Sequence, residues 1–175
     1  MHPKFVADAM VAHLARWLRV MGYDVLDHTQ CGEDDAEILA CARSTGRVII
    51  TRDEDLHARA VRAGLRSLLL RSGEVEHALA WIAHETGIDL SIDLGRTRCP
   101  LCNSPLVRVP SAEVHGAPDY VRERYSHVYV CESCGKIYWP GSHFTRMQAT
   151  LARAREVLKK LKSGEAKGIR ADDDW

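Results

Sequence analysis

The sequence Val48-Ile49-Ile50-Thr51, followed by Arg52 and Asp53, decides the fold. Its first four residues are all β-branched and uncharged, which predicts a strand buried on both faces. Such strands belong to parallel sheets that are covered by helices on both sides. The chain around this stretch alternates between strand-like and helix-like segments. We therefore predict an α/β fold in which helices flank a parallel sheet.

Hydrophobic periodicity locates the other elements of this sheet. From Met10 to Met21, apolar residues recur at steps of three and four, which is typical of an amphipathic helix. Gly22 and Gly46 each follow a predicted helix, as helix-ending glycines do. The predicted strands cover residues 4–7, 23–26, 48–51 and 65–70, and the predicted helices cover residues 10–21, 35–45, 54–63 and 74–84. Residues 27–33 are expected to form a polar loop.

The pattern changes near Gly95, which divides the chain into parts. Residues 96–140 are rich in Cys, Pro and Gly, with only short strand-like pieces at 106–109 and 127–130. A basic amphipathic helix then begins at Ser142 and reaches about Leu161. We expect an α/β domain over 1–95, a zinc ribbon over 96–141, a helix over 142–162 and a flexible tail over 163–175.

The charge is balanced overall but not along the chain. The 175 residues carry 24 Lys+Arg and 24 Asp+Glu. Residues 1–95 hold 10 basic and 15 acidic side chains, whereas residues 96–175 hold 14 and 9. The rear part is thus better suited to meet phosphate, although a drift of surface charge explains the same counts. No stretch approaches the roughly 20 apolar residues of a membrane span, and no signal peptide is evident, so we expect a cytoplasmic protein without a membrane partner.

Six cysteines fall into two groups. Cys99 and Cys102 form one C-x-x-C pair, and Cys131 and Cys134 form a second, with Gly135 after it. Four thiolates complete the tetrahedral shell of a structural zinc ion and leave no open position. Free or redox-active thiols are the alternative, but a segment this poor in apolar residues needs a bound metal to fold. Cys31 and Cys41 stand apart and are assigned to packing.

Acidic residues follow the predicted strands. Asp8 comes after the first strand and Asp53 after the third, with Asp55 two residues on, while Asp34 and Asp35 begin the helix between them. The carboxyl ends of parallel strands share one edge, so these carboxylates should meet there. Clustered carboxylates suit Mg²⁺ or Mn²⁺, and two such ions hydrolyse phosphodiesters.

Each of these acids also stands where a helix needs a cap. Aspartate is a preferred N-cap because its side chain accepts hydrogen bonds from free backbone N–H groups. Asp34, with Glu37 three residues later, has the pattern of a capping box. Spacing alone leaves the capping and metal-binding interpretations evenly matched.

Several motifs together resemble a known family. Asp8 after the first strand, Asp35-x-x-Ile38 and Thr51-Arg52-Asp53 resemble the acids of PIN-domain ribonucleases. The combination more closely resembles the Mut-seven C-terminal RNase family, in which a PIN-like domain precedes a zinc ribbon. The further motifs that carry this resemblance are Phe5-Val6-x-Asp8-Ala9-Met10, Leu14-Ala15-Arg16-Trp17-Leu18-Arg19, Gly22-Tyr23-Asp24, the two C-x-x-C pairs and Trp139-Pro140-Gly141-Ser142-His143.

The resemblance implies a metal-dependent endoribonuclease with Asp8, Asp35 and Asp53 as ligands of Mg²⁺ or Mn²⁺, and it allows a homodimer. Asp34 and Asp55 are further candidates. The chain departs from the PIN pattern at Leu56, where PIN proteins commonly place an acid. A second PIN acid also lacks a clear counterpart.

Basic and aromatic residues supply candidate RNA contacts. They are Arg16, Arg19, Arg52, Trp139, His143 and Arg146. Arginine binds phosphate, and aromatic rings stack on unpaired bases, which suits single-stranded or looped RNA. The alternatives are that Arg16 and Arg19 pair with acids such as Asp24 and Asp27, and that the rear helix presents an ordinary solvated face.

Two other functions compete with the endoribonuclease. A non-catalytic RNA- or ribosome-binding adaptor on the same scaffold is favoured by the missing PIN acids. A toxin-like nuclease controlled by a partner is the third hypothesis.

Overall fold

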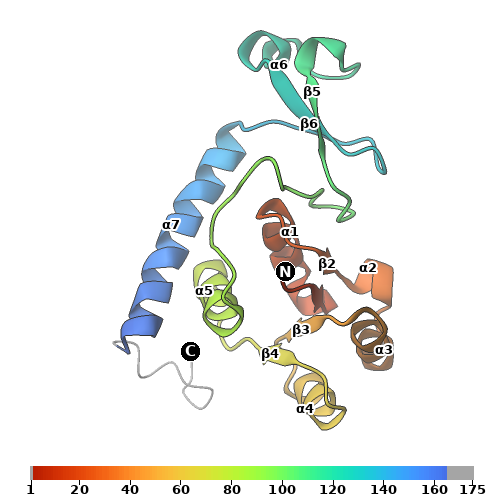
Figure 1. Ribbon diagram of the computed structural model, residues 1–175, viewed down its shortest axis with the longest axis vertical. Helices are drawn as coiled ribbons and strands as arrows, with labels where there is room; N and C mark the ends of the chain where they lie inside the picture. Colours follow the sequence, from red (N-terminus) through yellow and green to blue (C-terminus); the bar gives the residue numbers. More distant parts are fainter. Residues whose placement is uncertain (1, 165–175) are drawn as a thin grey trace.

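The computed structural model describes residues 2–164 (Figure 1). Four strands form a parallel sheet in the order β2-β1-β3-β4. They are β1 (Phe5–Ala7), β2 (Val25–Leu26), β3 (Val48–Thr51) and β4 (Ser67–Leu69). The predicted fold class is confirmed, and the stretch that decided it, β3, is buried at all four residues. Most of the tail expected over 163–175 lies outside the described residues.

Helices cover both faces of the sheet because alternate residues of the central strands point to opposite faces and pack into two separate hydrophobic cores. Phe5, Ala7 and Ile50 belong to one core, and Val6 and Ile49 belong to the other. The first core is closed by α1 (Ala12–Val20) and α5 (Val75–Thr86), and the second by α3 (Asp35–Thr45) and α4 (Glu54–Arg62). A short 3₁₀ helix, Ala9–Val11, replaces the expected first turn of α1.

The cysteine region (residues 96–141) carries a small antiparallel sheet in the order β5-β6-β7. In Figure 1 its strands rise away from the parallel sheet. The elements are β5 (Val107–Pro110), a 3₁₀ turn (Ser111–Glu113), α6 (Asp119–Arg124), β6 (His127–Val130) and β7 (Ile137–Tyr138). β5 and β6 match the predicted strand pieces, whereas α6 and β7 are too short to leave a periodic signal.

The C-terminal helix α7 (Ser142–Ser163) packs along α5 (Figure 1). Leu151 and Ala154 are fully buried in the first core. Arg153 of α7 forms an ion pair with Glu76 of α5 at 2.9 Å. Arg155 donates a hydrogen bond to the carbonyl of Leu90. The apolar stripe of this helix therefore packs against its own chain.

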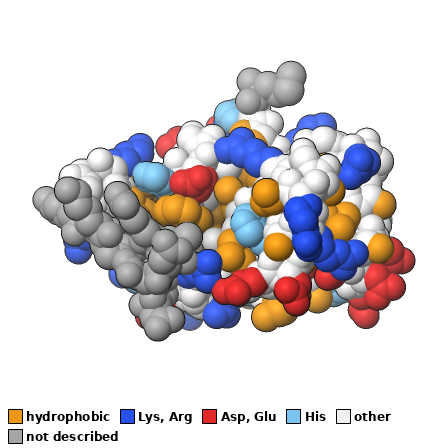
Figure 2. All heavy atoms as spheres, turned by 90° about the horizontal axis from the view of Figure 1, so that it is seen from below, with side chains coloured by type: hydrophobic (Ala, Val, Ile, Leu, Met, Phe, Trp, Pro, Cys, Tyr) orange, Lys and Arg blue, Asp and Glu red, His pale blue; other side chains and the backbone are white. Residues whose placement is uncertain are grey.

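The surface mixes both signs of charge. On the face shown in Figure 2, basic, acidic and apolar side chains are interspersed. Arg71 pairs with Glu54 and Arg59 pairs with Asp35 within residues 1–95, whereas Arg153 of the rear part pairs with Glu76 and so offsets one charge of the acidic excess. In residues 2–164, none of the helices is long and apolar enough to cross a membrane.

One assignment made from the sequence is wrong. The sequence assigns Cys31 and Cys41 to packing, but they form a disulfide. Cys31 ends α2 (His28–Cys31), a short helix in the expected polar loop, and Cys41 lies on α3. Both side chains also contact the second core. The helix α2 turns the chain back against α3, which brings the two Cα atoms to 5.7 Å.

This disulfide predicts a measurable stabilisation. Replacing both residues, as Cys31→Ala with Cys41→Ala, should lower the free energy of unfolding by about 2–3 kcal/mol, since the unfolded chain is no longer constrained by a short closed loop. Urea unfolding followed by circular dichroism measures the change. An unfolding midpoint equal to that of the wild type would contradict the disulfide.

Candidate active site and zinc centre

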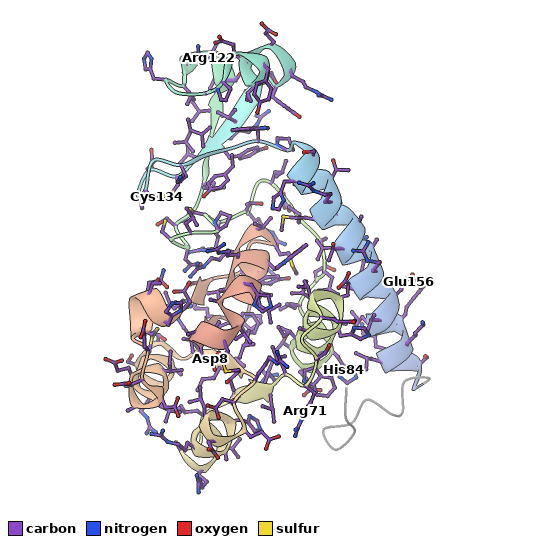
Figure 3. All side chains as sticks on the ribbon, turned by 180° about the vertical axis from the view of Figure 1, so that it is seen from behind. Asp8, Arg71, His84, Arg122, Cys134 and Glu156 are labelled. Carbon is purple, nitrogen blue, oxygen red and sulfur yellow. A yellow bond between two sulfur atoms is a disulfide. The ribbon has the colours of Figure 1, made fainter. Side chains whose placement is uncertain are left out.

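Two acids meet at the carboxyl edge of the parallel sheet because β1 and β3 are parallel neighbours. Ala7 pairs with Ile50, and the N–H of Asp8 continues this pairing by donating to the carbonyl of Ile50. Asp53 lies two residues beyond the end of β3. We call this position, with Asp8 and Asp53, the acidic edge. Figure 3 shows Asp8 at this place on the ribbon.

Thr51 joins the two acids. It is fully buried, and its hydroxyl donates to Oδ2 of Asp8 at 2.5 Å. The same hydroxyl accepts from the backbone N–H of Asp53 at 2.9 Å. Thr51 was not among the predicted site residues, although its place directly before Arg52 and Asp53 was a signal for it.

The carboxylate of Asp8 is incompletely satisfied. Its side chain is buried, and Oδ1 has no hydrogen-bond partner among the described residues. Burial raises the pKa of Asp8, the hydrogen bond from Thr51 and the backbone N–H of Val11 oppose this rise, and the charge of Asp53 adds to it. A buried carboxylate oxygen without a donor is a costly arrangement. A divalent cation would supply the missing partner, so the residues fit the Mg²⁺ or Mn²⁺ expected here.

Asp53 has a second task as the N-cap of α4. Its Oδ1 accepts from the N–H groups of Asp55 and Leu56, at 2.8 and 3.2 Å. The capping interpretation is therefore correct for this residue. The cap uses Oδ1 alone, so it does not prevent Oδ2 from binding a cation.

The other predicted acids do not join Asp8 and Asp53 in a ligand cluster among the described residues. Asp34 is exposed before α3, and Glu37 accepts from its N–H as the capping box predicts. Asp35 pairs with Arg59 of α4 at 3.0 Å, and Asp55 is exposed in the first turn of α4. In residues 2–164, the four cysteines are the one group of three or more potential ligands close enough to share an ion. The acidic edge is thus a pair rather than a triad.

The four cysteines converge as predicted. The Sγ atoms of Cys99 and Cys134 lie 3.6 Å apart, and those of Cys102 and Cys131 lie 3.4 Å apart. A tetrahedron with Zn–S bonds of about 2.3 Å has sulfur–sulfur edges of about 3.8 Å, so the arrangement fits zinc.

The two cysteine loops share one backbone design. In the first knuckle (residues 99–103) the N–H of Asn103 donates to the carbonyl of Cys99, and in the second (residues 131–135) Gly135 donates to Cys131. Asn103 and Gly135 both have a positive φ, near 70°. Glycine adopts this conformation freely and asparagine more readily than most residues. Gly135 therefore provides the positive φ of the second knuckle, and Asn103 takes the same role in the first knuckle.

Protonation differs among the cysteines. Burial opposes ionisation of Cys102, but hydrogen bonds involving Ser104 lower its pKa to about 6. Burial raises the pKa of Cys131 to about 12. Zinc would hold all four sulfurs as thiolates, so binding it releases protons.

Arg19 differs from its predicted role as an RNA contact. Its side chain is 1% exposed, and it forms an ion pair with Asp27 at 3.0 Å. The guanidinium also donates to the carbonyls of Val25, Pro100 and Leu101 and to Gln30. The alternative weighed from the sequence, pairing with a nearby acid, is thus what the structure shows. Arg19 fastens the first knuckle to α1 and β2.

Asn103 reinforces the same junction. Its amide donates to Asp24 at 2.7 Å, and its carbonyl oxygen accepts from the N–H of Val25 at 3.0 Å. β2 is an edge strand, so this bond occupies one of its free backbone donors. The first knuckle is therefore built into the edge of the parallel sheet.

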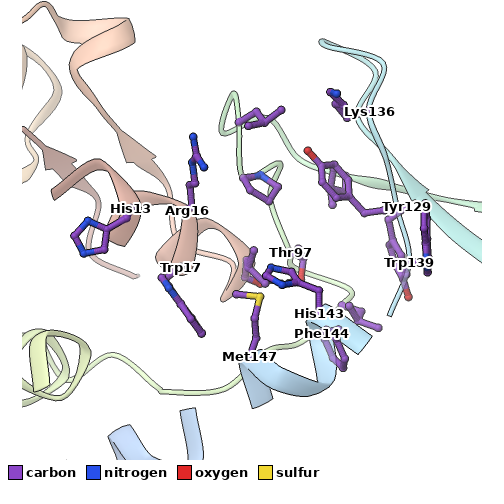
Figure 4. Close-up of a pocket in the computed structure, with 16 residues that line it drawn as sticks. His13, Arg16, Trp17, Thr97, Tyr129, Lys136, Trp139, His143, Phe144 and Met147 are labelled. Atoms are coloured by element: carbon purple, nitrogen blue, oxygen red, sulfur yellow. Dashed lines mark hydrogen bonds between the residues drawn. The ribbon is translucent and has the colours of Figure 1, made fainter. Parts of the chain in front are cut away.

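Three predicted RNA contacts come together. Arg16, Trp139 and His143 line one pocket of about 530 Å³ (Figure 4). Arg52 is exposed beside Asp53, and Arg146 is exposed one turn after His143 on α7. Neither of these two arginines lines the pocket.

The comparisons with known proteins agree with this arrangement. The family model for the Mut7-C RNAse domain matches residues 3–151, which include the acidic edge, both knuckles and half of α7. The chain belongs to the Mut7-C RNase family. No curated protein and no solved structure gives a significant match. The resemblance expected from the sequence is confirmed, and the match assigns an RNase-type domain to the chain.

The buried position of Arg19 predicts that replacing it destabilises the protein far more than replacing Arg16 of the same helix. Arg19→Met should lower the free energy of unfolding by about 3–5 kcal/mol, because it leaves Asp27 buried without its partner. Arg16→Met, at an exposed position of the same helix, should change it by no more than about 0.5 kcal/mol. Urea unfolding of both variants measures this. Equal losses in the two variants would show that Arg19 has no special role at the junction.

Proposed function

We propose that this Mut7-C protein is a metal-dependent endoribonuclease that hydrolyses RNA phosphodiester bonds and leaves 5′-phosphate and 3′-hydroxyl ends. The observation that supports it is the buried, unpartnered Oδ1 of Asp8, next to the charge of Asp53. A buried carboxylate oxygen without a donor, within electrostatic range of a second carboxylate, favours a bound cation over a purely structural role.

The residues at the acidic edge have different proposed roles in metal binding, carboxylate orientation and phosphate binding. Asp8 and Asp53 would hold Mg²⁺ or Mn²⁺, which supplies charge that neutralises the scissile phosphate and lowers the pKa of the attacking water. Thr51 fixes Oδ2 of Asp8 and thereby limits rotation of the carboxylate. Arg52, exposed directly before Asp53, is placed to bind a phosphate oxygen of the substrate.

A second cation, as in a two-metal mechanism, would need further ligands. The family resemblance names Asp35 as a further ligand, but Oδ2 of Asp35 forms an ion pair with Arg59. Both side chains of this pair are more than one-third exposed, so the ion pair is weak and exchanges readily with solvent. We propose that Asp35, with Asp34 or Asp55 beside it, completes the site when substrate and metal are present.

One observation favours the alternative function. In the described residues, no three acids lie close enough to share an ion. An adaptor that binds RNA without cutting it would keep the scaffold and the zinc centre while lacking turnover. The toxin-like nuclease gains no support from the site geometry.

The acidic edge predicts the outcome of a cleavage assay. Purified protein should cut single-stranded RNA when Mn²⁺ is added, and both Asp8→Asn and Asp53→Asn should reduce the rate by about 100-fold or more. Loss of a residue that only supports a metal ligand costs 10–100-fold, and loss of a ligand should cost at least as much. Cleavage is followed on a labelled oligonucleotide, and the ends of the products are identified.

The matched control is Asp119→Asn, the same chemical change on the exposed helix α6, which should retain full activity. Zinc content and thermal unfolding show whether each variant is folded. RNA that binds to the wild type but stays intact with Mn²⁺ would support the adaptor instead.

A further inference from the structure

The pocket of about 530 Å³ lies where three parts of the chain meet. Figure 4 shows His13, Arg16 and Trp17 of α1 on one side and His143, Phe144 and Met147 of α7 on the other. The first knuckle and the strands β6 and β7 form the remaining wall. The volume is within the range of sites that bind small ligands or parts of larger ones.

The lining of this pocket combines flat aromatic rings with positive charge. Five of the lining residues are aromatic, namely Trp17, Tyr129, Tyr138, Trp139 and Phe144. Arg16 and Lys136 add permanent positive charge, and both residues are exposed. None of the lining residues is Asp or Glu. A ligand with a flat ring and an attached anion matches this lining, and a nucleotide has both features.

The aromatic wall is held in place before any ligand binds. The indole of Trp139 lies directly over Gly141, where an added Cβ would come within 3.1 Å of Nε1. Tyr120 meets the same indole edge to face, at 6.3 Å between ring centroids. The hydroxyl of Tyr138 contacts Sγ of Cys99 at 3.2 Å, which ties this wall to the zinc centre. Rings that are already fixed lose little conformational entropy on binding.

One face of α1 connects the pocket to the acidic edge. His13, Arg16, Trp17 and Val20 line the pocket at spacings of three and four residues, so they share a face of about 10 Å in length. At the start of this face, burial and the charge of Arg52 both lower the pKa of His13, which puts Arg52 within electrostatic range of this end of α1. Arg52 in turn precedes Asp53. A single strand along this face would keep its phosphates over basic side chains as far as the acids.

We propose that this pocket, which we name the base pocket, holds one unpaired base of the RNA strand. The inference rests on the proposed function, since that function identifies the bound strand as the RNA substrate. The pocket would then fix the distance between the bound base and the phosphodiester that is cut. A base within a duplex is stacked and cannot enter, so the pocket selects single-stranded or looped RNA.

The test measures binding without cleavage. In the Asp8→Asn background, which keeps the RNA intact, fluorescence anisotropy reports the affinity for a short labelled single-stranded RNA. A second oligonucleotide of the same length carries abasic sites and so keeps the phosphates without the bases. The intact base pocket should bind the normal RNA about tenfold more tightly than the abasic RNA, as expected for one stacked base.

Two variants address the pocket itself. Trp139→Leu should lower affinity for the normal RNA about tenfold and leave affinity for the abasic RNA unchanged, which a merely unfolded variant would not do. Arg16→Ala, at an exposed helical position, should weaken binding of both RNAs alike. Lys159→Ala removes the same charge at the far end of α7 and should affect neither.

The possible results separate this inference from the proposed function. Equal binding of normal and abasic RNA, with no effect of Trp139→Leu, would overturn the base pocket even if the protein cuts RNA. Base-dependent binding by a protein that never cuts RNA would support the base pocket and reject the nuclease. If a peptide rather than RNA were found to fill the pocket, the inference would be overturned as well.

Discussion

The hydroxyl of Thr51 is the contact on which the account of this molecule depends. It donates to Asp8 and accepts from the N–H of Asp53, so it holds two acidic segments together at the end of neighbouring strands. The parallel pairing of β1 and β3 brings these segments close, and burial then makes the carboxylate of Asp8 costly to keep charged. A divalent cation bound to Asp8 would relieve that cost, which is the role that we propose for the acidic edge beyond the capping of α4.

The zinc centre has a role beyond the stability of its own segment. Arg19 and Asn103 join the first knuckle to α1 and to the edge strand β2 through buried or half-buried hydrogen bonds. Tyr138 joins the same centre to the aromatic wall of the base pocket. These contacts fix the first knuckle relative to the parallel sheet, which the proposed positioning of RNA by the cysteine region requires.

Sequence patterns predicted the sheet, its flanking helices, the cysteine cluster and the positions of Asp8 and Asp53, because burial and ligand chemistry leave regular spacings in a sequence. They did not predict which partner a side chain finds. For Arg19 the sequence leaves open a phosphate contact and pairing with Asp27, since its helical spacing from Arg16 is the same whether it faces RNA or a buried acid. The pairing of Cys31 with Cys41 depends on the turn of α2, which is too short to show periodicity.

The most direct test of the central claim is a titration of the zinc-loaded protein with Mn²⁺, in which free Mn²⁺ is followed by electron paramagnetic resonance. The wild type should bind Mn²⁺ and gain thermal stability from it. Asp8→Asn should bind at least tenfold more weakly, consistent with removal of a ligand. Without Mn²⁺ it should be at least as stable as the wild type, because a buried charge has been removed. Equal Mn²⁺ affinity in the two proteins would contradict the claim that Asp8 is placed to hold a metal ion.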